Sequence, residues 1–264
     1  MSVVANWVEQ GLSRRDFLKQ SGALGLGLGL SSLLSFPGLA AACGMDTSSK
    51  AKNSSEIPLL SPLGVQDFSG LKDRVSKITW PQLCQHIGLY EGYVKKTNDA
   101  LTQLATARTT SDYSTARTLQ LNHSFARNGA ILHAAYFNNL GEDQPTIGPL
   151  TAKLIARDFG SEAAFWGELM AIAKAMRGWV IVGYSTAENR LVHHGLDAHD
   201  GGSPLASIPL LVLDVYEHAY MIDFGTNRAG YLDVFKASIR WGVVEDRLKQ
   251  ALAVANTLNH HPVV

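Results

Sequence analysis

An apolar run near the C-terminal end of the chain leads directly into a pair of possible metal ligands. The run spans residues 209–213 (PLLVL), and Asp214 and His218 follow it four residues apart. Because the short run predicts a buried strand, Asp214 falls at a strand-to-helix junction. From there a carboxylate and an imidazole at this spacing can both reach one metal ion. This pair is the strongest functional signal in the sequence.

The N-terminal residues are typical of an export signal. Arg14 and Arg15 precede Phe17-Leu18-Lys19 and a run rich in Gly, Ala and Leu. This is the twin-arginine pattern, which exports folded proteins, so residues 1–42 are expected to be a signal peptide. The protein is then expected in the periplasm or another extracytoplasmic compartment of the envelope. A membrane anchor or a buried helix is the alternative, which the glycines and Pro37 disfavour.

Two interpretations of the end of this signal remain open. Residues 40–42 (AAA) before Cys43 offer a cleavage site, and they also form a weak lipobox in which Cys43 would carry a lipid. Leu39 lies one position further from the cysteine than a lipobox usually has it. Membrane attachment is therefore expected through Cys43 only, if the lipobox is used. Residues 43–56 are mostly polar and cannot bury enough surface to fold, so we expect a flexible linker.

The charge balance excludes some classes of partner. Lys and Arg number 23, and so do Asp and Glu, so the chain has no global field for nucleic acid or an anionic membrane. Any attraction for a small anion must come from positive charges gathered locally around its binding site. Of the two cysteines, Cys84 alone lies in the part expected to fold. Its helical surroundings predict a small buried side chain without an internal disulfide.

Residues 57–144 are expected to form an antiparallel helical hairpin. Apolar residues recur every three or four positions from about Trp80 to Leu140, as they do on one face of a helix. The pattern breaks at residues 109–112 (TTSD), which predicts a turn between two helices. Pro81 suits the first turn of the first helix.

Residues 145–264 are expected to form an α/β domain with a small three-stranded antiparallel sheet. The pattern predicts helices over residues 150–159 and 161–176, strands over 178–184, 190–194 and 209–215, and helices over 228–239 and 243–255. With the helical hairpin before it, this domain gives an α+β fold class.

The run PLLVLDVYEHAY, residues 209–220, closely resembles the metal-binding signature of the iron/manganese superoxide dismutases. The resemblance spans most of the part expected to fold. Its C-terminal section continues through residues 223–235 (DFGTNRAGYLDVF), Trp241 and Arg247. It implies that Asp214 and His218 are ligands of one metal ion.

The same family implies two further ligands. Residues 128–140 resemble the segment in which a His precedes an aromatic pair and Asn-Leu, so His133 would be the third ligand. Matching Tyr93 to the family's active-site Tyr leaves His86 seven residues before it rather than eight. A one-residue deletion reconciles the two, and seven residues are nearly two turns, so both side chains share a face. The ungapped match puts Gln85 there instead, but imidazole is the better ligand.

The resemblance also implies a reaction and a partner. A mononuclear centre would hold one iron or manganese ion per chain and disproportionate superoxide to dioxygen and hydrogen peroxide. Tyr93 would anchor the solvent network at the substrate channel. Tyr216 and Glu217 lie beside the ligand His218, and Glu217 would bridge to the ligand histidine of a second subunit. This implies a homodimer formed through the metal-site face.

Several positions depart from the family pattern. Tyr216 stands where the family has Trp, Met221 where it usually has Tyr, and the second His of the first helix is missing. The family's solvent-linking Gln would stand at Gly129 or near Ala175, and neither supplies an amide. Losing such a group typically costs about 10–100-fold in activity or metal affinity. The alternative function is therefore a non-catalytic metal-binding or partner-binding module of the same fold.

Three further histidines lie close together near a Gly-rich loop. Because imidazole is a common metal ligand, His193, His194 and His199 could bind a second ion. Surface positions for all three are the simpler expectation.

Overall fold

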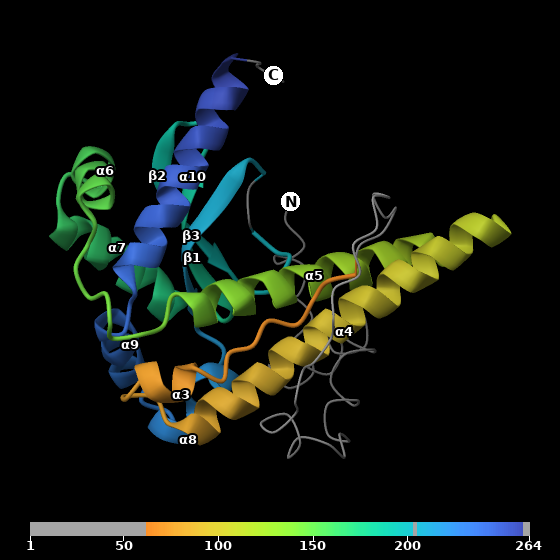
Figure 1. Cartoon of the computed structure of the whole chain (residues 1–264), viewed down its shortest axis with the longest axis horizontal. Coiled ribbons are helices and arrows are strands. Elements are labelled where there is room, and N and C mark those ends of the chain that lie inside the picture. The colour runs from red at the N-terminus through yellow and green to blue at the C-terminus, as the bar shows by residue number, and fades with distance from the viewer. Residues whose placement is uncertain (1–61, 203–204, 261–264) are drawn as a thin grey trace, which may run out of the picture. The chain divides into compact units, whose positions relative to one another are not determined.

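The computed structural model describes residues 62–202 and 205–260. The expected signal peptide (1–42) and linker (43–56) lie outside these residues. Among the described helices, none is both long and apolar enough to cross a membrane. Helices and one three-stranded antiparallel sheet make up this part of the chain (Figure 1), so the predicted α+β class is confirmed.

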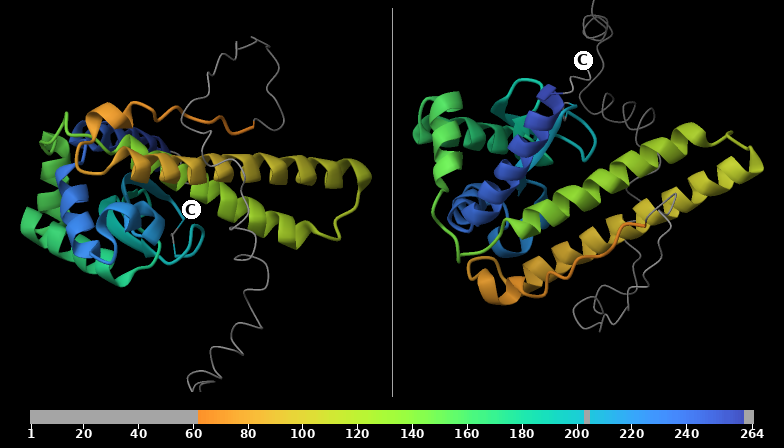
Figure 2. Two further views of the ribbon diagram at one scale, coloured as in Figure 1. Left: turned by 90° about the horizontal axis from the view of Figure 1, so that it is seen from below. Right: turned by 45° about the horizontal axis from the view of Figure 1, so that its top comes forward.

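The hairpin consists of two long helices with a short one before them. They are α3 (Leu71–Arg74), α4 (Trp80–Thr110) and α5 (Ala116–Asn138). Thr79 caps α4 by accepting a hydrogen bond from the amide of Gln82, and Pro81 lies in the first turn as predicted. Ser111 ends α4 in the left-handed conformation, at the predicted break. The two helices lie side by side and extend well past the sheet (Figure 2).

The sheet places two distant segments beside one tryptophan. Its strands are β1 (Trp179–Ser185), β2 (Arg190–Leu196) and β3 (Ser207–Asp214), in the order β2-β1-β3 with antiparallel neighbours. Trp179 pairs with Leu196 on one side and with Asp214 on the other. The last residue of β2 and the last residue of β3 therefore lie at the same end of the sheet, on either side of Trp179. The loop that follows Leu196 is thus close to the first candidate ligand.

Helices cover the sheet and complete the core. Two of them, α6 (Pro149–Phe159) and α7 (Glu162–Ala175), pack on β2, and α7 also packs on β1. Gly160 separates these two helices with a φ of 79°, a conformation that favours glycine. The hairpin helix α5 packs on β3. All residues of β1 are buried as a result.

The C-terminal elements differ slightly from the prediction. They are the 3₁₀ turn η1 (Glu217–Ala219), α8 (Met221–Phe224), α9 (Arg228–Ala237) and α10 (Trp241–His260). The chain leaves β3 through the short η1 rather than a regular α-helix. Helix α10 continues past its predicted end at residue 255, because no Gly or Pro interrupts residues 256–260.

Two polar side chains, one buried and one half-buried, fix α5 against β3. The Asn139 amide nitrogen donates to the carbonyl of Val212 at 2.9 Å. The Arg247 guanidinium, from α10, donates to the Asn139 amide oxygen at 2.9 Å, to the Leu210 carbonyl at 2.8 Å and to the Ala135 carbonyl at 3.2 Å. Burial lowers the pKa of Arg247 to about 10, so it stays charged at neutral pH. These bonds hold the end of α5 at a set position relative to the end of β3.

Cys84 differs from its prediction. It is partly buried on α4 and is disulfide-bonded, so the expectation of a side chain without a disulfide is wrong. Helical periodicity reports the face on which a residue lies, whereas a disulfide depends on the distance to another sulfur.

Candidate metal centre

Four side chains from four elements converge inside the protein. They are His86 of α4, His133 of α5, Asp214 at the end of β3 and His218 of η1, and their ligand atoms all lie within 4.8 Å of one another. The Asp214 Oδ2 atom lies 3.1 Å from Nε2 of His86, 3.1 Å from Nε2 of His218 and 3.7 Å from Nε2 of His133. Only the His218 side chain reaches solvent to any extent, at 25% exposure. The structure therefore brings together all four residues that the resemblance implied.

Helix α4 presents His86, and not Gln85, to this centre. The His86 side chain is buried, whereas Gln85 is exposed on the same helix. His86 also packs edge-on against the His133 and His218 rings, with centroids 5.0 and 4.9 Å away. The interpretation with a one-residue deletion is the one that the structure supports.

The hydrogen bonds of His133 leave one nitrogen free. Its Nδ1 donates to the Gly129 carbonyl one turn earlier on α5, at 2.6 Å. That bond puts the proton on Nδ1, so Nε2 carries a lone pair. This Nε2 is buried and has no hydrogen-bond partner in the structure. A buried acceptor left unpaired is costly, and a metal ion among these four residues would satisfy it.

Asp214 is held in its ionised form. Its Oδ1 accepts a hydrogen bond from the amide of Tyr216 at 2.9 Å. Burial alone would raise the pKa of Asp214, but the electrostatic attraction and hydrogen bonds that it receives from His218 and His86 outweigh burial and hold that pKa well below its ordinary value. The backbone is held too, because the Tyr231 hydroxyl donates to the Asp214 carbonyl at 2.8 Å. The centre thus has one fixed negative charge.

Burial keeps two of the histidines neutral. It lowers the pKa of His86 despite the opposing effect of Asp214, and it lowers the pKa of His133 well below the ordinary value. Neutral imidazole is the form that binds a metal ion. Three imidazole nitrogens and one carboxylate are donors that suit iron or manganese. The residues present therefore fit such an ion.

A polar side chain of α4 fixes the position of the His218 turn. The Gln82 amide nitrogen donates to the His218 carbonyl at 2.6 Å, and its amide oxygen accepts from the amide of Ile222 at 2.9 Å. The buried Gln82 side chain therefore uses both its amide nitrogen and its amide oxygen to hold η1 and α8 against the hairpin. This sets the distance between His218 and the hairpin histidines.

Tyr93 begins a hydrogen-bonded chain beside the centre. Its ring centroid lies 5.2 Å from that of His133. The Trp179 indole nitrogen can only donate, and it lies 2.9 Å from Nδ1 of His199. His199 therefore carries its proton on Nε2, which donates to the Tyr93 hydroxyl at 2.8 Å. The proton of Tyr93 itself is left for another acceptor.

Burial keeps both members of this hydrogen bond neutral. It raises the pKa of Tyr93 above its ordinary value and lowers the pKa of His199 to about 4. At neutral pH neither group is charged, so the direction of the bond from His199 to Tyr93 is preserved.

His199 is the functional residue that the sequence analysis missed. Its side chain is buried, at 2% exposure, so the expectation of a surface position is wrong. The His199 ring also lies against Gly129, one of the two positions where the family's solvent-linking amide was expected. A Cβ added at Gly129 would lie 2.9 Å from a Tyr93 ring carbon and 3.2 Å from a His199 ring carbon. The space beside Gly129 is filled by residues from two other segments. An imidazole from the loop after β2 thus stands beside Tyr93.

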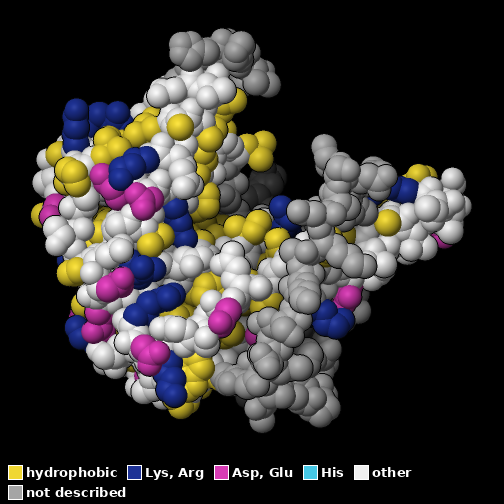
Figure 3. Space-filling view, viewed as in Figure 1, with side chains coloured by type: hydrophobic (Ala, Val, Ile, Leu, Met, Phe, Trp, Pro, Cys, Tyr) yellow, Lys and Arg dark blue, Asp and Glu magenta, His cyan; other side chains and the backbone are white. Residues whose placement is uncertain are grey.

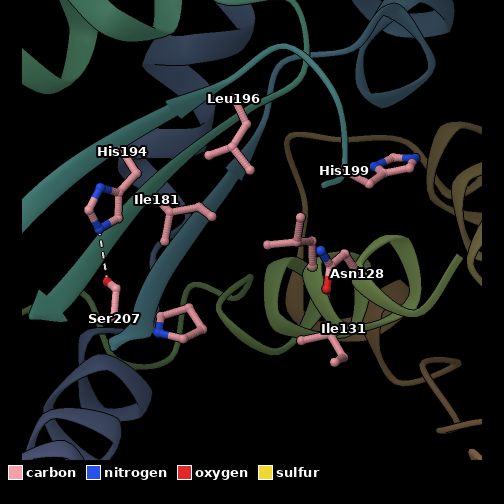
Figure 4. A pocket seen from close by; sticks show the side chains of 9 residues that line it. Asn128, Ile131, Ile181, His194, Leu196, His199 and Ser207 are labelled. Atoms are coloured by element: carbon pink, nitrogen blue, oxygen red, sulfur yellow. Dashed lines mark hydrogen bonds between the residues drawn. The ribbon is translucent and has the colours of Figure 1, made fainter. Parts of the chain in front are cut away.

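The three histidines near the Gly-rich loop do not share a site. His193 contacts Glu168 at 3.0 Å, whereas His194 bonds the Ser207 hydroxyl at 2.8 Å. Figure 4 shows His194 and His199 well apart around a cavity of about 180 Å³. Among the described residues, the four-ligand centre is the one group placed to hold a metal. The second-metal hypothesis has no support.

The remaining predicted residues flank His218. The Tyr216 ring stacks on the His218 ring with centroids 5.1 Å apart, and its hydroxyl donates to the Asp197 carbonyl at 3.2 Å. Burial raises the pKa of Tyr216 to about 12. Glu217 is exposed. Its role at a subunit contact stays a prediction.

Comparison with known proteins gives one consistent result. Residues 148–247 match the family model described as the C-terminal domain of iron/manganese superoxide dismutases. The chain is 37% identical over 178 residues to an iron superoxide dismutase of Aquifex pyrophilus, an alignment that covers 64% of this chain and 83% of that protein. It is 36% identical over 192 residues to a manganese superoxide dismutase of Halobacterium salinarum, covering 70% and 92%. Similar relatives thus include both an iron and a manganese protein.

Proposed function

Because the chain belongs to the iron/manganese superoxide dismutase family, we propose that its four-ligand centre holds one iron or manganese ion and disproportionates superoxide. Two superoxide anions and two protons give one dioxygen and one hydrogen peroxide. The observation that carries this proposal is the buried, unpaired Nε2 of His133 beside Asp214, His86 and His218. A bound ion would supply the chemistry by alternating between its divalent and trivalent states.

The protein's own residues would prepare the centre and handle protons. Neutral His86 and His133 offer lone pairs, and ionised Asp214 offsets part of the charge of a cation. Since His199 donates to the Tyr93 hydroxyl, Tyr93 can direct its own proton toward a small anion at the centre. This arrangement takes the place of the family's solvent-linking amide, which supports catalysis over the non-catalytic alternative.

A direct assay of purified protein tests the proposal. We expect about one iron or manganese per chain by elemental analysis, and superoxide dismutase activity on a nitroblue-tetrazolium gel. Protein stripped with a chelator should be inactive and should recover when the same metal is returned. A fully metallated protein without activity would instead identify the chain as the non-catalytic module.

The proposal includes a homodimer formed through the metal-site face. Glu217 is exposed and lies directly beside the ligand His218. Met221 and Ile222 of α8 follow closely and are 46% and 53% exposed. Exposed apolar side chains of this kind suit a subunit contact. In that contact, Glu217 would accept a hydrogen bond from the His218 ring of a second copy and orient it toward the metal.

Replacing Glu217 by Ala should weaken the dimer and metal retention together. Removing one member of a buried charge-assisted pair costs about 2–5 kcal/mol, so the dimer dissociation constant should rise by about 30-fold or more. Analytical ultracentrifugation with metal analysis measures both quantities. The Asp233→Ala variant, which removes an exposed carboxylate of α9, is the matched control. A dimeric and fully metallated Glu217→Ala protein would show that Glu217 is a surface residue.

We also propose that the protein works in the cell envelope. The support is the arginine pair of the expected signal peptide, which lies outside the described residues. Replacing Arg14 and Arg15 by Lys should leave the folded protein in the cytoplasm, as shown by cell fractionation and immunoblotting. Replacing other basic residues of the same segment, such as Lys19, gives the control. Unchanged export of the double variant would mean that the N-terminus uses another route.

Membrane attachment through Cys43 is the second part of this localisation proposal. A lipid would occupy the sulfur of Cys43, whereas Cys84, the other cysteine of the chain, is disulfide-bonded in the structure. Mass spectrometry of the exported protein, with and without reductant, distinguishes a lipid from a disulfide. Replacing Cys43 by Ala releases the protein from membranes only if the lipid is present.

A further inference from the structure

The surface charges of this chain are balanced, so an anionic substrate feels no strong long-range field. The net charge is zero. On the face shown in Figure 3, basic and acidic side chains alternate without a large patch of one sign. Capture of a small anion must then depend on a few charges close to the centre.

One lysine lies beside the tyrosine of the centre. Lys96 follows Tyr93 by three residues on α4, and its Nζ atom lies 5.6 Å from the centroid of the Tyr93 ring. Residues three apart on a helix share a face. The Lys96 side chain is exposed, and no acidic group within 4.0 Å of it is found among the described residues. No described carboxylate therefore offsets its charge beside the Tyr93 ring.

The field of Lys96 reaches the buried residues of the centre. Besides burial and the neighbouring His218, the charge of Lys96 contributes to the low pKa of His199. His199 is the direct hydrogen-bond partner of Tyr93. A positive charge that acts on this imidazole also acts on an anion that arrives beside the tyrosine.

The preceding lysine has a different environment. Lys95 forms an ion pair with Asp99 one turn later, with Nζ 2.6 Å from Oδ2. The carboxylate offsets its charge. Of these two adjacent lysines on α4, Lys96 has an unbalanced positive charge beside Tyr93, whereas the charge of Lys95 is offset by Asp99.

We propose that Lys96 is a guiding residue that draws anionic substrate to the metal centre past Tyr93. The inference rests on the proposed function for the identity of the substrate, superoxide. Unit charges about 6 Å apart in water change an encounter rate about threefold. Lys96 is a positioning residue in this role, since it attracts the anion without touching the reacting atoms.

The test compares Lys96→Gln with Lys95→Gln in metallated protein. Both variants lower the net charge by one unit, so global effects cancel. We expect kcat/KM for superoxide, measured by pulse radiolysis at low salt, to fall about threefold in Lys96→Gln and to stay near the wild-type value in Lys95→Gln. Lys96→Arg should restore the rate because the charge is retained. Since the Debye length is about 10 Å at 0.1 M and about 3 Å at 1 M ionic strength, the loss should disappear in 1 M salt.

A second readout does not depend on turnover. The dissociation constant of azide, from a spectroscopic titration, should rise about threefold in Lys96→Gln and remain unchanged in Lys95→Gln. Equal behaviour of the two variants would overturn the inference. So would a loss that persists in 1 M salt, because Lys96 would then act by holding the Tyr93 ring. Wild-type protein without activity would contradict the proposed function instead, and the azide titration would still decide the role of Lys96.

Discussion

Replacing His133 by Ala will produce protein that takes up little iron or manganese and has no measurable dismutase activity. His133 supplies the one buried nitrogen of the centre that has no protein partner. Losing a group that merely orients a ligand costs about 10–100-fold in metal affinity, so losing the ligand itself should cost more than about 100-fold. Elemental analysis after dialysis, together with the activity gel, measures the effect.

The same helix provides the control for this experiment. His123 lies on α5 outside the four-ligand group, so His123→Ala should retain metal and activity. Unfolding of the metal-free proteins, followed by circular dichroism, separates loss of the ligand from loss of the fold. Stoichiometric metal in folded His133→Ala would mean that the ion is bound elsewhere.

The metal-free protein will lose stability steeply as the pH falls below about 6.5. Burial lowers the folded-state pKa of His86 and His133, and that of His199 to about 4, from the ordinary value of 6.5. Between these values the unfolded chain binds protons that the folded chain does not, so the free energy of unfolding decreases as pH decreases. Each such histidine contributes up to about 1.4 kcal/mol per pH unit, which gives about 2–4 kcal/mol per unit between pH 6 and 5.

Urea unfolding of chelator-treated protein at several pH values measures this slope. Removing one of the three groups, as in His199→Gln, should reduce the slope by about 1 kcal/mol per pH unit. Asp214 acts in the same direction only at lower pH, because its contribution is lost below its ordinary pKa of 3.8. Stability that does not change between pH 7 and 5 would mean that the buried imidazoles are protonated in the folded chain.

The sequence was sufficient to place the four candidate ligands, because they match a family pattern and three of them lie on regular elements. His86 and Tyr93 are seven residues apart, and α-helical geometry places them near the same face, which separates His86 from Gln85. Asp214 ends a strand whose apolar run is easily recognised. The boundaries of the hairpin were also predictable, since Pro81 and the turn after Thr110 have clear local signals.

His199 could not be predicted in the same way. It lies in a loop with no periodicity, and its two hydrogen-bond partners, Tyr93 and Trp179, come from other elements. Its burial depends on the pairing of Trp179 with both Leu196 and Asp214, which is a property of the assembled sheet. The family pattern did predict a polar side chain beside Tyr93, but at Gly129 or near Ala175 rather than in the loop after β2. The role of a residue whose position depends on long-range packing cannot be predicted from local sequence patterns.

The ligands are also far apart along the chain, which determines when the centre can form. His86 and Asp214 are separated by 128 residues. The hairpin is built from local contacts, whereas the centre requires docking of the hairpin on the completed sheet, a late step for a contact of such sequence separation. During synthesis at about 5–20 residues per second, the 81 residues after His133 take roughly 4–16 s to reach Asp214. A nascent chain therefore exposes two histidines of an incomplete site, and metal capture marks the end of folding rather than its beginning.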